Sequence, residues 1–141
     1  MGIEELLRES RRKLARLTPQ EADRALADGA LLIDIRSEAQ RASDGVVPGT
    51  RFVPRNALEW RVDPSSPSRD PEIARADALM ILMCDEGYQS SLAAATLQDL
   101  GLSRATDVVG GFQGWRATGL PVKPVPRRPA SSLLSWFTRL V

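Results

Sequence analysis

Short apolar runs that alternate with helical patterns constrain the fold of this chain more than any other feature. Residues 31–35 (LLIDI) and 79–83 (LMILM) are short and almost wholly apolar, as strands buried on both faces of a parallel sheet are. Residues 51–53 (RFV) and 106–109 (TDVV) are weaker strand candidates. Helical patterns fall between the runs, at about 37–43, 56–61 and 90–100. The alternation predicts an α/β fold with a four- or five-stranded parallel sheet and helices on both faces.

Helix signals and proline-rich stretches divide the chain into three parts. Residues 3–16 carry Ile3, Leu6, Leu7 and Leu14 near one helical face, which predicts a helix of undetermined docking. The stretch 18–21 (TPQE) is a capping box with proline at the first helical position, so a helix begins there and ends near Gly29. We therefore expect a helical extension over 1–17, a domain over 18–122, and a proline-rich linker with a short amphipathic helix over 123–141.

Composition excludes several functional classes. The chain has 141 residues and a formal net charge of +1, which suits one domain and lacks the strong basic charge of a nucleic-acid-binding protein. Its longest apolar run, 78–84, is far below the roughly 20 residues that a membrane span needs. The first residues (MGIEELLRES) do not resemble a secretory signal. We expect a cytoplasmic protein that binds no nucleic acid.

The lone cysteine, Cys84, lies where a ligand site is expected. It follows the buried run 79–83, precedes a loop containing Gly87, and is close to a helix that begins near Ser90. Ligands of open α/β sheets bind at the carboxyl ends of strands, and amides at a helix N-terminus stabilise a thiolate. The chain has no histidine, so a Cys-His pair is excluded. The residues alone leave open whether Cys84 is reactive or is an inert buried thiol.

Four motifs resemble the rhodanese family in their order and spacing. They are Asp34-Ile35-Arg36, residues 45–50 (GVVPGT), residues 84–90 (CDEGYQS) and residues 110–115 (GGFQGW). The resemblance implies a single rhodanese-like domain in which a loop over 84–89 surrounds the sulfur of Cys84. It also implies a sulfurtransferase: Cys84 takes a sulfane sulfur from a small-molecule or protein persulfide donor, and passes it to a thiol or another nucleophile. No metal and no organic cofactor is called for.

Residue roles follow from the same resemblance. Catalysis is expected at Cys84, and substrate binding at the loop residues Asp85, Glu86, Gly87, Tyr88, Gln89 and Ser90. Asp34 is expected to support the loop. Arg36 either faces the site or ties down a neighbouring loop, and we favour the structural role. Arg55, in a helix start capped by Asn56, either supplies a cation to the pocket or is solvated, and Trp115 is expected in the core.

The active-site loop departs from the family pattern in its charge. Thiosulfate-using members commonly carry a basic residue after the cysteine, whereas Asp85 and Glu86 follow it here and Gln89 stands at another often basic position. Two carboxylates repel a dianion, so thiosulfate is doubtful as the physiological donor. The alternative is that both acids point to solvent.

Two other functions are weighed against sulfur transfer. A cysteine phosphatase would need an arginine six positions after the cysteine, but that position is Ser90. The remaining rival is an inactive binding or regulatory module.

The end of the chain carries an apolar stripe with basic residues before it. The stripe consists of Leu133, Leu134, Phe137, Leu140 and Val141. So short a helix is marginal alone, so it is expected to dock on its own domain, on a second subunit as a homodimer, or, least favoured, on an anionic membrane surface.

Overall fold

Four parallel strands form the centre of the computed structural model, which describes residues 1–126. The strands are β1 (Leu31–Asp34), β2 (Arg51–Phe52), β3 (Met80–Met83) and β4 (Thr106–Asp107), in the spatial order β2-β1-β3-β4. The predicted α/β fold with a parallel sheet is confirmed. β1 and β3 are the long central strands, and their register pairs Leu31 with Met80 and Asp34 with Met83.

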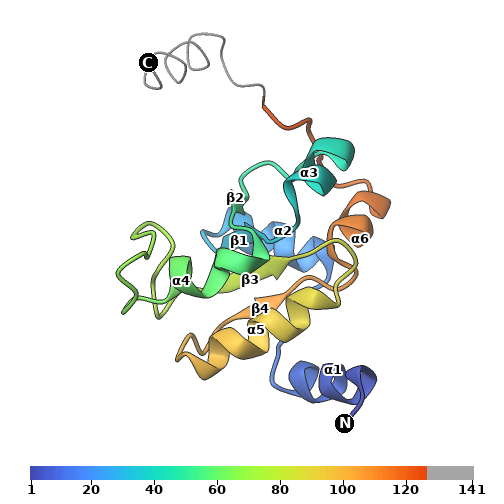
Figure 1. The fold of residues 1–141 in the computed structure, drawn as a ribbon. Helices are drawn as coiled ribbons and strands as arrows, with labels where there is room; N and C mark the ends of the chain where they lie inside the picture. Colours follow the sequence, from blue (N-terminus) through green and yellow to red (C-terminus); the bar gives the residue numbers. More distant parts are fainter. Residues whose placement is uncertain (127–141) are drawn as a thin grey trace, which may run out of the picture.

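Helices cover both faces of this sheet (Figure 1). They are α1 (Ile3–Arg12), α2 (Pro19–Ala27), α3 (Glu38–Asp44), α4 (Leu58–Val62), α5 (Gln89–Asp99) and α6 (Gly111–Ala117), with a short 3-10 turn, η1, at Arg55–Ala57. Alternate residues of the strands face opposite sides. Ile33 and Leu82 pack with α4 and α5, whereas Leu32 and Ile81 pack with α2 and α6.

Two of the predicted helix boundaries were wrong. The first helix ends at Arg12 rather than at residue 16. It packs on α5, and its Leu7 is buried while Ile3 and Leu6 stay exposed. Asn56 does not cap a helix, because it lies inside η1, and α4 begins only at Leu58 with no side-chain cap.

One helix was missed. The stretch that we expected to bury Trp115 forms α6, and Trp115 is indeed in the core. Three glycines within five residues, at 110, 111 and 114, hide the helix from propensity arguments. Gly110 adopts a left-handed conformation with a φ of 77° just before the helix begins.

The capping box at residues 18–21 is confirmed. Thr18 Oγ1 accepts from the Glu21 amide at 3.2 Å, and the Glu21 carboxylate accepts from the Thr18 amide at 2.9 Å. These two hydrogen bonds lower the pKa of Glu21.

After α6, the chain pairs once more with the domain, at Lys123. The Val46 amide donates to the Lys123 carbonyl at 2.7 Å, and the Lys123 amide donates back at 2.8 Å. The predicted apolar stripe at 133–141 lies outside the described residues. None of the helices in residues 1–126 has an apolar stretch long enough to cross a membrane.

Candidate active site

A pocket of about 330 Å³ opens where the central strands β1 and β3 end. The chain leaves β1 toward β2 on one side and leaves β3 toward β4 on the other, which makes this edge the topological switch point of the sheet. Ile35, Arg36, Ser37 and Gln40 line the pocket from the β1 side, and Cys84, Asp85, Glu86, Tyr88 and Gln89 line it from the β3 side. Most of the sequence-predicted site residues therefore meet at one place.

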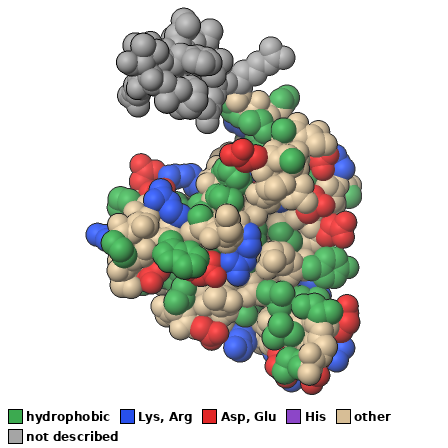
Figure 2. Space-filling view, in the orientation of Figure 1, with side chains coloured by type: hydrophobic (Ala, Val, Ile, Leu, Met, Phe, Trp, Pro, Cys, Tyr) green, Lys and Arg blue, Asp and Glu red, His purple; other side chains and the backbone are tan. Residues whose placement is uncertain are grey.

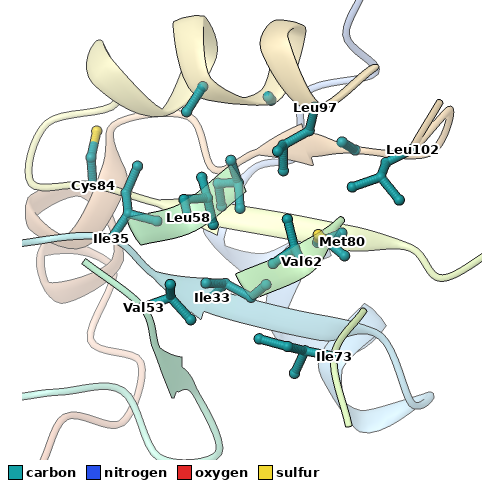
Figure 3. Close-up of a cluster of buried hydrophobic side chains, with 14 residues drawn as sticks. Ile33, Ile35, Val53, Leu58, Val62, Ile73, Met80, Cys84, Leu97 and Leu102 are labelled. Atoms are coloured by element: carbon teal, nitrogen blue, oxygen red, sulfur yellow. The ribbon is translucent and has the colours of Figure 1, made fainter. Parts of the chain in front are cut away.

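Hydrogen bonds converge on the sulfur of Cys84. The amides of Gly87 and Ser90 lie 3.1 Å and 3.3 Å from Sγ, and the thiol donates to Ser90 Oγ at 3.2 Å. The side chain lies at the end of a hydrophobic cluster, and its sulfur is directed toward the start of α5 (Figure 3). Cys84 is 7% exposed, so the sulfur is shielded from bulk water but still borders the pocket. Amides in this arrangement stabilise negative charge on sulfur.

Backbone contacts with α6 fix the shape of the loop. The Phe112 amide donates to the Cys84 carbonyl at 2.8 Å, and the Gln113 amide donates to the Asp85 carbonyl at 3.0 Å. Gly87 has a φ of 87°, and a Cβ there would lie 2.8 Å from the Gly110 nitrogen. Glycine is required at this position on both grounds.

The two acids of the loop are held differently. Asp85 is half-buried, and its carboxylate accepts a hydrogen bond of 2.9 Å from Gln113, whereas Glu86 is exposed. Gln113 also donates to Asp44 at 3.0 Å. This bond is the largest of several causes that lower the pKa of Asp44. Both loop acids are among the residues that line the pocket, and the exposed Glu86 also meets solvent.

Asp34 and Arg36 form a buried ion pair in the pocket wall. Two hydrogen bonds join the guanidinium to the carboxylate, at 3.1 Å and 2.9 Å, and a third reaches the Gly45 carbonyl at 2.8 Å. The guanidinium also stacks on the Phe112 ring, 3.8 Å from its centroid. Arg36 thus ties the loop after α3 to the sheet, which is the structural role that we favoured, although the residue also lines the pocket.

Arg55 and the remaining loop residues lie at the rim. Arg55 donates a hydrogen bond of 2.6 Å to the Glu59 carboxylate, which pairs its charge, and a longer one of 3.4 Å to Gln89. Arg55 is not among the residues that line the pocket. Tyr88 is 57% exposed, with the Arg11 guanidinium 5.6 Å from its ring centroid.

A polar network beneath the loop was not predicted from the sequence. Ser90 and Ser91 each donate to the buried carboxylate of Asp107 at 2.7 Å, and Arg16 pairs with the same carboxylate. The signal was present, because a carboxylate inside a predicted buried strand requires a partner. The partner lies 91 residues earlier in the chain, which no local pattern reveals. In residues 1–126, no group of histidine, cysteine and acidic side chains is placed to hold a metal ion.

Similarity to known proteins agrees with this geometry. The sequence profile of the Rhodanese-like domain matches residues 18–118. The chain is 33% identical over 103 residues to the thiosulfate sulfurtransferase GlpE of Ectopseudomonas mendocina, covering 73% of this chain and 85% of that one. It is 34% identical over 104 residues to the GlpE protein of Pseudomonas putida, covering 73% and 86%.

Two solved structures show the same fold. A Rhodopseudomonas palustris protein of unknown function, described as a possible tyrosine phosphatase, superposes with a TM-score of 0.80 at 33% identity, covering 87% of this chain and 95% of that one. The polysulfide-sulfur transferase homodimer of Wolinella succinogenes superposes with a TM-score of 0.65 at 20% identity, covering 89% of each chain. With four family motifs in place, a profile match over most of its length and relatives above 30% identity, this chain belongs to the rhodanese-like domain family.

Proposed function

We propose that this rhodanese-like sulfurtransferase carries sulfane sulfur as a persulfide on Cys84 and passes it to a thiol or another nucleophilic acceptor. The convergence of the Gly87 and Ser90 amides on the only sulfhydryl in the chain carries the proposal. We place the protein in the cytoplasm, where reducing conditions keep a free thiol such as Cys84 out of disulfides.

The reaction consists of two displacements. The Cys84 thiolate attacks the outer sulfur of the donor, a new bond forms to Sγ, and the sulfur–sulfur bond of the donor breaks to release its thiolate. An acceptor thiolate then attacks the outer sulfur of the Cys84 persulfide, and Cys84 leaves as a thiolate. The sulfur atom moves without net oxidation or reduction of the protein, and the loop amides stabilise the anion at both ends of the cycle.

The donor is proposed to be an uncharged or protein-bound persulfide rather than thiosulfate. Asp85 and Glu86 line the pocket, and the one cation among the lining residues, Arg36, is bonded to Asp34. Arg55 at the rim is bonded to Glu59. A dianion such as thiosulfate therefore meets two acids and no free cation among the residues that line the pocket. Several relatives are named thiosulfate sulfurtransferases. The proposed donor differs from theirs because of the charge of this loop, so that charge is the feature to test.

Mass spectrometry of protein purified without reductant tests the carrier role. We expect an adduct of one sulfur atom on the Cys84 peptide, which is lost after treatment with a thiol and absent from Cys84→Ser. Cys84→Ser abolishes transfer from every donor, because the chain has no other thiol. A wild-type protein that never accepts sulfur from any donor, though folded, would instead be a binding or regulatory module.

Steady-state assays with two donors test the charge argument. Wild type is compared with the double variant Asp85→Arg/Glu86→Ser, using thiosulfate, a dianion, and the persulfide of 2-mercaptoethanol, which carries no charge outside its persulfide group. Repulsion between unit charges about 4 Å apart is about 1 kcal/mol in water and about 4 kcal/mol at an effective dielectric of 20. We therefore expect at least a several-fold rise in kcat/KM for thiosulfate, larger at low salt than at high salt, and a smaller change for the less charged persulfide donor.

A matched control separates the local effect from net charge. Asp99→Arg/Asp28→Ser makes the same change in charge at two exposed residues that do not line the pocket, and should leave both activities unchanged. Efficient thiosulfate turnover by wild type, unaltered in the loop variant, would show that the two carboxylates do not govern donor choice.

Phosphatase activity is the rival suggested by the description of one solved relative. A phosphatase loop grips the phosphoryl group with an arginine, but Ser90 occupies that position and its hydroxyl is committed to Cys84 and Asp107. We expect no hydrolysis of p-nitrophenyl phosphate above the rate of Cys84→Ser.

A further inference from the structure

An ion pair lies directly beneath the active-site loop. Arg16 donates to Asp107 through Nε at 2.8 Å and through Nη2 at 3.2 Å, and the Asp107 side chain is completely buried. Arg16 Nη2 also donates to the Gly87 carbonyl at 3.1 Å. The pair therefore contacts both β4 and the loop that surrounds Cys84.

Main-chain pairing places Arg16 at this position. The Leu17 amide donates to the Asp107 carbonyl at 3.0 Å, and the Val109 amide donates to the Leu17 carbonyl at 2.8 Å. The segment before α2 thus runs alongside the end of β4, and its arginine reaches under the sheet edge. Arg16 precedes residues 18–118, the part of the chain that the family profile matches.

One hydroxyl links the ion pair to the sulfur. Ser90 Oγ lies 2.7 Å from Asp107 Oδ2 and 3.2 Å from Cys84 Sγ. An ionised carboxylate only accepts hydrogen bonds, so the Ser90 hydroxyl hydrogen points to Asp107 and its oxygen is left to accept from the thiol. Asp107 therefore fixes the orientation of the group that touches Cys84.

The charge of Asp107 opposes the formation of a second anion so close to it. A buried carboxylate one hydroxyl away from the sulfur disfavours the thiolate, and Arg16 offsets that effect with its two hydrogen bonds. Such effects are stronger in a buried site than at the surface.

The other cationic side chains around the loop also have hydrogen-bond partners. Arg36 is bonded to Asp34, and Arg55 is bonded to Glu59. Arg11 donates to Ser91 at 3.1 Å and to the Gly87 carbonyl at 2.8 Å. Asp85 and Glu86 line the pocket and add negative charge where the sulfur borders the pocket.

We propose that the Arg16–Asp107 pair, acting through Ser90, sets the pH at which Cys84 becomes a nucleophile. Arg16 and Asp107 are positioning residues, since neither contacts the sulfur. The segment that precedes the family-matched region is thereby part of the working site. The proposal deepens, and rests on, the assignment of Cys84 as the sulfur carrier.

The rate of Cys84 alkylation by iodoacetamide, measured against pH, tests this proposal. The thiolate is the form that reacts, so the rate follows the ionised fraction of Cys84 whether or not the protein transfers sulfur. Unit charges about 6 Å apart interact strongly enough to move a titration midpoint by about 0.5 to 2 pH units, depending on the effective dielectric. Asp107→Asn should move the midpoint of the rate profile down by an amount in this range. Arg16→Gln should move it up by a smaller amount, because the guanidinium is farther from the sulfur.

Three further variants make the interpretation specific. The double variant Arg16→Gln/Asp107→Asn should have a midpoint between those of the two single variants and below that of wild type, because the loss of Asp107 has the larger effect. Arg16→Lys keeps the cation and should also stay close to wild type. Arg12→Gln removes an exposed charge from the same N-terminal segment and should leave the profile unmoved. Because Asp107 is completely buried and the Arg16 side chain is only 18% exposed, these shifts should change less with salt than those of an exposed charge.

Opposite shifts in the single variants, with an intermediate midpoint in the double variant, support the proposal. A pair that only held the loop in place would not shift the midpoint in opposite directions according to which charge is removed. Shifts in the same direction, or unmoved profiles in variants whose melting temperatures have fallen, would overturn it and leave the pair a structural clamp. Failure of the carrier role is distinguishable: the shifts would then appear without any sulfur adduct on Cys84.

Discussion

At the scale of single residues, Gln113 binds two acids, of which Asp85 lines the pocket. Its side-chain nitrogen donates to both Asp44 and Asp85, and the bond to Asp44 is the main reason that the pKa of Asp44 is lowered. Gln113→Leu should therefore raise the pKa of Asp44 toward its ordinary value. The measurement is the carboxyl carbon chemical shift of Asp44 against pH.

The same substitution should change how stability depends on pH. A carboxyl whose pKa is depressed by folding stabilises the folded state above its unfolded pKa, about 4, and this contribution is lost as the pH falls through the folded pKa. Gln113→Leu should lose less stability between neutral and acidic pH than wild type in urea unfolding. Gln98→Leu is the control, because Gln98 also donates two hydrogen bonds but only to the carbonyls of Lys13 and Ala105. An Asp44 titration that is identical in Gln113→Leu and wild type would contradict the assignment.

At the scale of elements, the contact between the active-site loop and α6 depends on glycine. Gly87 and Gly101 both have positive φ angles, 87° and 95°, but only at Gly87 would a Cβ meet other atoms within 4 Å. Both alanine variants incur the conformational strain, of about 1–3 kcal/mol. Gly87→Ala should lose at least about 1 kcal/mol more, because of its overlap with the α6 start, and should also lose Cys84 reactivity. Equal losses in urea unfolding would show that the loop can move away from α6.

At the scale of the whole molecule, the basic and apolar end of the chain has a predicted role in folding or assembly. The described surface mixes acidic and basic side chains without a dominant patch of one sign on the face shown (Figure 2). Burying a Leu or Phe side chain of the stripe at 133–141 would contribute about 1.5–3 kcal/mol. Removing residues 127–141 should therefore lower the melting temperature if the stripe docks in cis, or halve the solution mass if it joins two subunits. A truncated protein that matches the full chain in both measurements would refute this role.

Local patterns in the sequence determined the fold class and the place of the lone thiol. Strand and helix periods, the capping box at Thr18 and the apolar run before Cys84 depend on neighbouring residues, so they can be read along the chain. Parallel strands then bring the segments after β1 and β3 to one edge, which is why the pocket residues were anticipated. The resemblance to a known family supplied the roles that we expected for Asp34 and Arg36, which local patterns do not contain.

Only the tertiary structure decided which charges act on the thiol. The sequence shows two acids beside Cys84. It does not show that Gln113 donates to one of them, that Glu59 forms an ion pair with Arg55, or that Arg16 donates to the loop. Charge interactions depend on distance and burial in space, and the partners here are separated by up to 91 residues along the chain. Periodicity fixes which face of an element is buried, whereas side-chain pairing across elements is set by how those faces pack.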